Sequence, residues 1–156
     1  MECIMNAQKN SPEYIKTLVT ENQIEQAMNI LDHFSEDKSL WFQNAYAVCL
    51  MRLNRPKDAV KVLTPFVYRG GSVVADVKVP DKVKLNLAEA MFLTGHIAGA
   101  VNLLTDIKEN SQHRQKLVEA FKNWKKSLSC WSRLIVALGV LPYDKPLALE
   151  QPFGEP

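Results

Sequence analysis

The sequence has few cysteines, few glycines and no long apolar run, and these shortages exclude several classes of protein. Its three cysteines, Cys3, Cys49 and Cys130, are far apart and form no CxxC pair. This spacing argues against a disulfide scaffold and against a zinc site, and it favours a reducing compartment. No stretch approaches the ~18 apolar residues that span a bilayer, and the first residues lack a basic flank followed by an apolar run. We therefore expect a soluble, cytoplasmic protein without stable membrane insertion.

The net charge is also small, and this limits the choice of partner. The 156 residues include 19 basic and 17 acidic side chains, for a net charge of +2. Such a balance is too small to argue for nucleic acid as a partner. With 47% apolar residues, 8 prolines and 6 glycines, the composition favours a helix-rich globular chain over a disordered one. The length predicts one domain, over residues 1–139.

No group of residues in the sequence indicates catalysis. His33, His96 and His113 lie in different predicted elements, with no serine, cysteine or carboxylate at a spacing typical of a triad or a metal site. We expect each of them to be a turn or surface histidine. The pair Gly70 and Gly71 lacks the other glycines and the lysine of a phosphate-binding loop. The sequence therefore predicts a protein that is not an enzyme and has no cofactor or metal.

What the sequence does contain is one pattern that occurs three times. Each copy has a turn-forming residue, a large or rigid residue two positions on, an alanine three further, and a leucine four after that. The copies are Asn22, Ile24, Ala27 and Leu31; Asn54, Pro56, Ala59 and Leu63; and Gly95, Ile97, Ala100 and Leu104. A turn between two segments of helical periodicity predicts a helix hairpin, here at about 11–34, 39–68 and 81–109. Because one such unit cannot bury its apolar face alone, the hairpins must stack.

The pattern resembles the tetratricopeptide repeat (TPR), most clearly in the third copy. The residues that carry the resemblance there are Leu87, Ala88, Met91, Gly95, Ile97, Ala100 and Leu104. The resemblance covers roughly residues 10–110, although the copies are spaced by 32 and 41 residues instead of the 34 of the family. It implies an all-α fold, namely a right-handed superhelical array of antiparallel helix hairpins. It also implies a protein-protein interaction module that binds a peptide segment of a partner in its concave groove.

The resemblance also implies where that groove lies, because the first helices of successive repeats line the concave face in this family. The groove positions carried over to this chain are Lys16, Val19, Asn44, Val48, Met51, Lys82, Leu85, Asn86, Glu89 and Phe92. Such a groove is apolar at its centre and suits an extended or helical peptide. Some members of the family clamp the terminal carboxylate of a peptide with lysines and asparagines. The residues that could serve in this way here are Lys16, Asn44, Lys82 and Asn86, but apolar and acidic residues interrupt the set.

Two further segments complete the predicted domain. Residues 69–80 form an insertion in which Val73, Ala75, Val77 and Val79 alternate with other residues, typical of a loop that packs its valines on the array or of a lid or edge strand. An amphipathic pattern at about 112–139 predicts a single long helix that caps the open end of the array. The far end of this helix would leave Trp131, Ile135 and Leu138 available for self-association.

The Pro-rich segment 140–156 cannot be helical and predicts an extended tail. Leu147, Leu149 and Phe153 could anchor it as a strap. The sequence leaves open whether the groove is empty or filled by this tail or by the insertion at 69–80. Two alternatives to the interaction module also stay open: a small TPR-type chaperone for an aggregation-prone client, and a homodimeric structural subunit.

Overall fold

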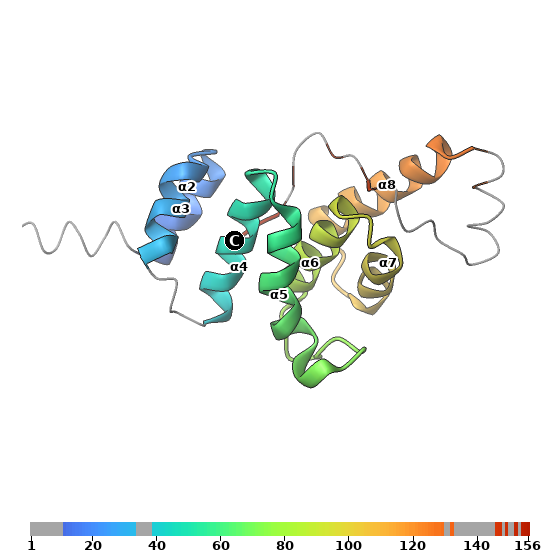
Figure 1. Cartoon of the computed structure of the whole chain (residues 1–156), viewed down its shortest axis with the longest axis horizontal. Coiled ribbons are helices and arrows are strands. Elements are labelled where there is room, and N and C mark those ends of the chain that lie inside the picture. The colour runs from blue at the N-terminus through green and yellow to red at the C-terminus, as the bar shows by residue number, and fades with distance from the viewer. Residues whose placement is uncertain are drawn as a thin grey trace, which may run out of the picture.

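The structure is a computed structural model that describes residues 11–33, 39–129, 132, 146–147, 149, 152 and 154–156. Within this part of the chain it is all-α, with seven α-helices packed in sequential pairs and no strand. The helices are α2 (Pro12–Thr20), α3 (Ile24–His33), α4 (Leu40–Arg52), α5 (Pro56–Val67), α6 (Asp81–Leu93), α7 (Ile97–Asp106) and α8 (Gln112–Ser127). Their bounds agree with the three predicted hairpins. The pairs follow one another along the long axis of the molecule (Figure 1).

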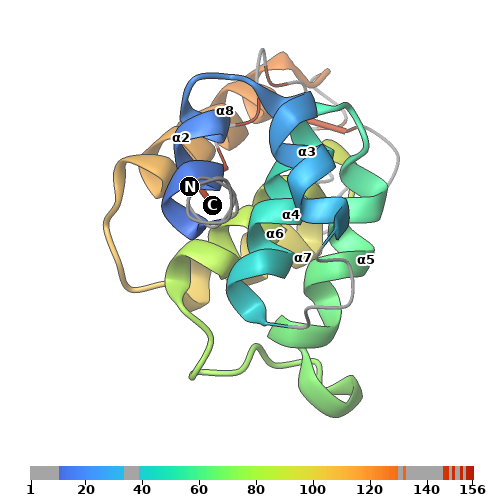
Figure 2. The ribbon, with the colours of Figure 1, turned by 90° about the vertical axis from the view of Figure 1, so that its left-hand side faces the viewer.

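The first helix of each pair contacts the first helix of the next pair. Thus α2 packs on α4, α4 packs on α6, and α8 covers α6. The second helices, α3, α5 and α7, each pack against the helix that precedes them in sequence. In the end-on view of Figure 2 the chain end marked C lies on the side of the array opposite α5. The helices α2, α4 and α6 therefore form the layer on which a functional surface was expected.

The three turns within the hairpins have the same geometry. Asn22, Asn54 and Gly95 all adopt a left-handed backbone, with φ of 61°, 59° and 84°. The amide of the following residue donates in each case to the carbonyl five positions earlier, at 2.8 Å, from Gln23 to Leu18, from Arg55 to Leu50 and from His96 to Met91. This is the Schellman ending of a helix, which asparagine and glycine favour because they tolerate positive φ. The predicted register of the three copies is confirmed at these turns.

The alanine of each copy lies where two helices approach closely. Ala27, Ala59 and Ala100 are all 0% exposed. We expect Ala100→Leu to lower the free energy of unfolding by about 1 to 3 kcal/mol, because the larger side chain overpacks the contact between α6 and α7. Thermal or urea unfolding measures the change, and Ala98→Leu, at a half-exposed position of α7, is the matched control. An unchanged midpoint for Ala100→Leu would show that the register of the third repeat is wrong.

The insertion between α5 and α6 forms no strand. It begins with a short 3-10 turn at Arg69–Gly71 and continues as irregular backbone. Ala75 and Val79 are buried, whereas Val73 and Val77 are 93% and 88% exposed. The expectation that the insertion packs its valines on the array is therefore right for Val79 and wrong for Val73 and Val77. A turn accounts for this, because the Asp76 carboxylate and carbonyl accept from the amides of Lys78 and Val79.

The last described helix is shorter than the sequence pattern predicts. The helix α8 ends at Ser127, and Leu128 has extended backbone with φ −71° and ψ 150°. The Ser127 hydroxyl donates to the Trp124 carbonyl, and the Ser129 hydroxyl accepts from the Ser132 amide as a helix-capping residue does. The continuous helix expected over about 112–139 is therefore interrupted at Leu128, and beyond Ser129 only Ser132 of the expected helix is described. The predicted self-association residues Trp131, Ile135 and Leu138 lie outside the described residues, and no described helix is long and apolar enough to cross a bilayer.

Candidate peptide-binding site

The ten predicted groove residues lie on α2, α4 and α6, but most of them are covered. Eight are buried: Val19, Asn44, Val48, Met51, Leu85, Asn86, Glu89 and Phe92. The other two, Lys16 and Lys82, are exposed. An asparagine or glutamate at 0% exposure needs hydrogen-bond partners, because a buried polar group without them costs free energy. Two different parts of the chain provide these partners and thereby cover two parts of the predicted groove.

The helix α8 covers the part of the groove next to α6. The ring of Phe92 stacks on the ring of Phe121, with centroids 5.6 Å apart. Beside this stack, His113 Nε2 lies 2.9 Å from Glu89 Oε2, and both side chains are buried. The expectation that His113 is a turn or surface residue is therefore wrong. Glu89 and Phe92 hold the capping helix and are not open to a ligand.

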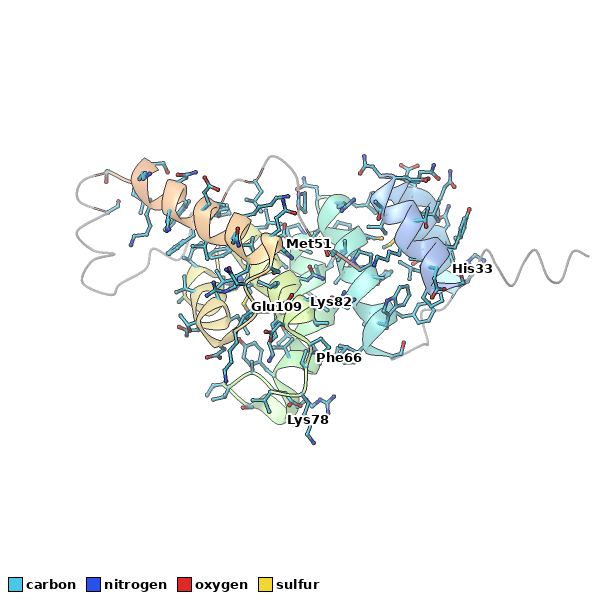
Figure 3. All side chains as sticks on the ribbon, turned by 180° about the vertical axis from the view of Figure 1, so that it is seen from behind. His33, Met51, Phe66, Lys78, Lys82 and Glu109 are labelled. Carbon is cyan, nitrogen blue, oxygen red and sulfur yellow. The ribbon has the colours of Figure 1, made fainter. Side chains whose placement is uncertain are left out.

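Residues 154–156 cover the part of the groove between α4 and α6. Gly154 and Pro156 are buried there, whereas Glu155 is exposed. The Cα of Gly154 lies over Val48 and Met51 of α4 and Asn86 of α6. Met51 and Lys82, which flank this place, lie on the same face of the molecule in Figure 3. We call the surface formed by Asn44, Val48, Met51, Arg52, Lys82 and Asn86 the α4–α6 site.

Two asparagine amides of the α4–α6 site bind the main chain of Glu155. Asn86 Nδ2 donates to the Glu155 carbonyl oxygen at 2.8 Å, and Asn86 Oδ1 accepts from the Glu155 amide at 3.3 Å. Asn44 Nδ2 donates to the same carbonyl oxygen at 3.2 Å. Asn86 Nδ2 also donates to Asn44 Oδ1 at 2.8 Å, which fixes the two amides relative to each other. A side-chain amide thus bonds to both polar groups of one residue, as the neighbouring strand of a sheet would.

Two cations contact the main chain on either side of Glu155. Arg52 Nη2 donates to the Gly154 carbonyl oxygen at 3.3 Å, and Lys82 Nζ donates to the Pro156 backbone oxygen at 3.1 Å. Arg52 also donates to the Val19 carbonyl at 2.6 Å, so that it joins α2 to α4. None of the ion pairs between described residues includes Arg52 or Lys82. Arg52 and Lys82 therefore bring two positive charges to the α4–α6 site.

A second contact fastens the tail to the same layer of helices. The Leu147 amide donates to the Phe92 carbonyl at 2.9 Å, and the Leu147 side chain is only 2% exposed. Leu149 is partly buried against the core. These residues agree with the predicted strap, while Phe153, the third predicted anchor, lies outside the described residues.

Sequence reasoning found part of the α4–α6 site and missed part of it. Three of the four residues proposed as a clamp, Asn44, Lys82 and Asn86, contact the main chain of residues 154–156, whereas Lys16 is exposed on α2. Arg52 was not predicted. Arg52 lies in the last turn of α4, where a basic residue is common because it interacts favourably with the helix dipole. Its position in the sequence therefore does not indicate a role in binding.

A further potentially reactive group, the Cys49 thiol, lies on α4 near Arg52. Cys49 is buried, and burial raises the pKa of its thiol to about 12, opposed weakly by the charge of Arg52. It is therefore a protonated core residue at neutral pH and not a nucleophile. No group of three or more potential ligands for a metal ion occurs within the described ranges.

No protein-family model, curated protein or solved structure significantly matches the chain.

Proposed function

We propose that this chain is a TPR-like interaction module that binds an extended peptide segment of a partner protein at the α4–α6 site, without catalysis. Three hairpins with the same Schellman turn and the same buried alanine support the TPR-like part of the proposal. Repeats of this kind stack into a curved, right-handed array whose inner layer offers an extended binding surface. The observation that carries the functional part is the paired contact of Asn86 with the amide and the carbonyl of Glu155.

The contacts at the α4–α6 site are of a kind that any peptide can make. The side chains of Asn44, Asn86 and Lys82 bond to main-chain atoms, and the Glu155 side chain is exposed. Main-chain hydrogen bonds give affinity for an extended segment, while the neighbouring side-chain contacts give selectivity. Both asparagines are 0% exposed beneath residues 154–156, so a segment that covers them must itself supply hydrogen bonds. A peptide backbone supplies the donor and acceptor that they need.

A peptide-display library tests the proposal. We expect the intact chain to select peptides whose binding disappears in the double variant Asn44→Leu, Asn86→Leu. This variant removes both members of a buried hydrogen-bonded pair and replaces them with apolar groups of similar size, a change that can be nearly neutral for stability. Circular dichroism and thermal unfolding establish that the variant is folded.

Two results would count against the proposal. The first is a library that gives no peptides either for the intact chain or for the variant Gly154→Val, in which the crowded side chain keeps residues 154–156 out of the site. The second is a set of selected peptides that bind the intact chain and the folded double variant with equal affinity, because they would then bind elsewhere. Peptides that bind the intact chain but not the folded double variant would support recognition of the peptide main chain by the two asparagine amides.

A further inference from the structure

The packing around Gly154 leaves no room for a side chain. A Cβ atom placed on this residue would lie 3.0 Å from Met51 Cε, 3.1 Å from Asn86 Oδ1 and 3.2 Å from Val48 Cγ2. Met51 is flexible and could move, but Val48 is β-branched and stiff. Asn86 is fixed by its bonds to Asn44 and Glu155. Even alanine is therefore crowded at this position, and a β-branched residue does not fit.

The charge at the α4–α6 site adds a second preference. Arg52 Nε is buried and has no hydrogen-bond partner within the described part of the chain. The ammonium of Lys82 contacts only the Pro156 backbone oxygen among the contacts described above. Both cations lie beside the exposed Glu155. An occupant with acidic side chains near its glycine therefore gains electrostatic attraction that a basic occupant lacks.

The present occupant is covalently joined to the site that it fills. A tethered segment competes for its site at an effective concentration that can be of order 1 mM, which any second segment must overcome. Residues 154–156 hold the site by hydrogen bonds to main-chain atoms, and these are the bonds that a segment of another protein would make. Occupation in cis and binding in trans are therefore mutually exclusive.

We propose that the α4–α6 site is selective for an extended segment with a glycine at the position of Gly154, and that residues 154–156 occupy the site in cis until such a segment of a partner displaces them. This inference rests on the proposed function. It specifies the class of peptide that the α4–α6 site binds and the segment of the chain, residues 154–156, that competes with it. In the proposed partner segment, glycine is followed by a residue whose side chain faces solvent. An acidic side chain is favoured at that second position, and the backbone of the segment is extended.

The test uses the intact chain and a fluorescein-labelled peptide with the sequence of residues 146–156. The variant Gly154→Val places a β-branched side chain against Val48, Met51 and Asn86, which expels the tail from the site. Fluorescence anisotropy then measures binding of the peptide in trans. If the peptide has a Kd near 10 µM, a tethered competitor at ~1 mM weakens its apparent affinity ~100-fold. We expect Gly154→Val to bind the peptide about 100-fold more tightly than the wild-type chain does.

Two controls make the result specific. Pro146→Val introduces the same side chain at an exposed tail position, and this variant should bind the peptide as weakly as the wild-type chain does. A second peptide with valine in place of its glycine should not bind Gly154→Val. If Gly154→Val does not fold, Glu155→Pro replaces it, because proline removes the amide that donates to Asn86 Oδ1.

Other outcomes would contradict occupation of the site in cis, selection of glycine, or both. Equal affinity of the wild-type chain and Gly154→Val would contradict occupation in cis. Equal affinity of the two peptides for Gly154→Val would contradict selection of glycine and leave the proposed function standing. Failure of both peptides to bind overturns the inference. The display experiment then decides about the proposed function, since peptides that depend on Asn44 and Asn86 would still support it.

Discussion

Replacing Phe92 by alanine is expected to destabilise the fold by about 3 to 5 kcal/mol, the usual cost of truncating a fully buried phenylalanine. Phe92 lies on α6 and is 0% exposed, and its ring stacks on the Phe121 ring of α8. Phe121 in turn stacks on Trp124, with centroids 5.8 Å apart. The substitution leaves a cavity and removes an aromatic contact from the interface that holds the capping helix. Denaturant unfolding followed by circular dichroism measures the loss.

The aromatic pair of Trp41 and Phe42 provides a control. These residues form an edge-to-face contact with centroids 5.1 Å apart, but both are only partly buried. Phe42→Ala should therefore destabilise the chain clearly less than Phe92→Ala does. If Phe92→Ala lowers stability by less than Phe42→Ala, then Phe92 is not part of the core and the placement of α8 is wrong.

Replacing His113 by leucine is expected to lower the free energy of unfolding by about 1 to 3 kcal/mol, because it removes a hydrogen-bond partner from a buried polar group. His113 Nε2 lies 2.9 Å from Glu89 Oε2, and the Glu89 side chain is 0% exposed. Without the imidazole, the carboxylate loses a close hydrogen-bonding partner in an environment of low dielectric constant. Because the pair joins α6 to α8, we expect faster hydrogen exchange in α8 as well as a lower unfolding midpoint.

A double-mutant cycle separates the loss of the pair from the loss of packing. Glu89→Leu together with His113→Leu replaces both polar groups, and the pair of substitutions should be less destabilising than His113→Leu alone. His33→Leu, at an exposed position at the end of α3, should leave stability nearly unchanged. Strictly additive effects of the two single substitutions would show that Glu89 and His113 are not coupled.

The parts of the fold that depend on neighbouring residues could be predicted from the sequence. The turns at Asn22, Asn54 and Gly95 follow from the tolerance of asparagine and glycine for positive φ, which is a local property. The cap at Ser11 followed by Pro12 likewise depends only on adjacent residues, since the Ser11 hydroxyl accepts from the Tyr14 amide. Such features carry their signal in a short stretch of sequence.

The contacts between distant segments could not be predicted in the same way. Glu89 and His113 are 24 residues apart on different helices, and neither position is unusual in its own helix. The helix end at Leu128 is similar, because hydroxyl bonds of Ser127 and Ser129 decide it within a pattern that stays amphipathic. Asn44, Lys82 and Asn86 were named because the resemblance to the tetratricopeptide repeat implies that their positions line the groove. Arg52 was missed because its role depends on where residues 154–156 lie.

The most direct measurement for the whole account is an NMR experiment on the side-chain amides of Asn44 and Asn86 in the intact chain. The structure predicts nuclear Overhauser effects from the Asn86 side-chain amide protons to Glu155, because Asn86 bonds to both its amide and its carbonyl. Gly154→Val should abolish them, and the glycine-containing peptide should restore equivalent effects from its own residues. Effects from Glu155 that are absent from the wild-type chain would contradict occupation of the α4–α6 site by residues 154–156, and effects that persist in Gly154→Val would contradict its selection of glycine.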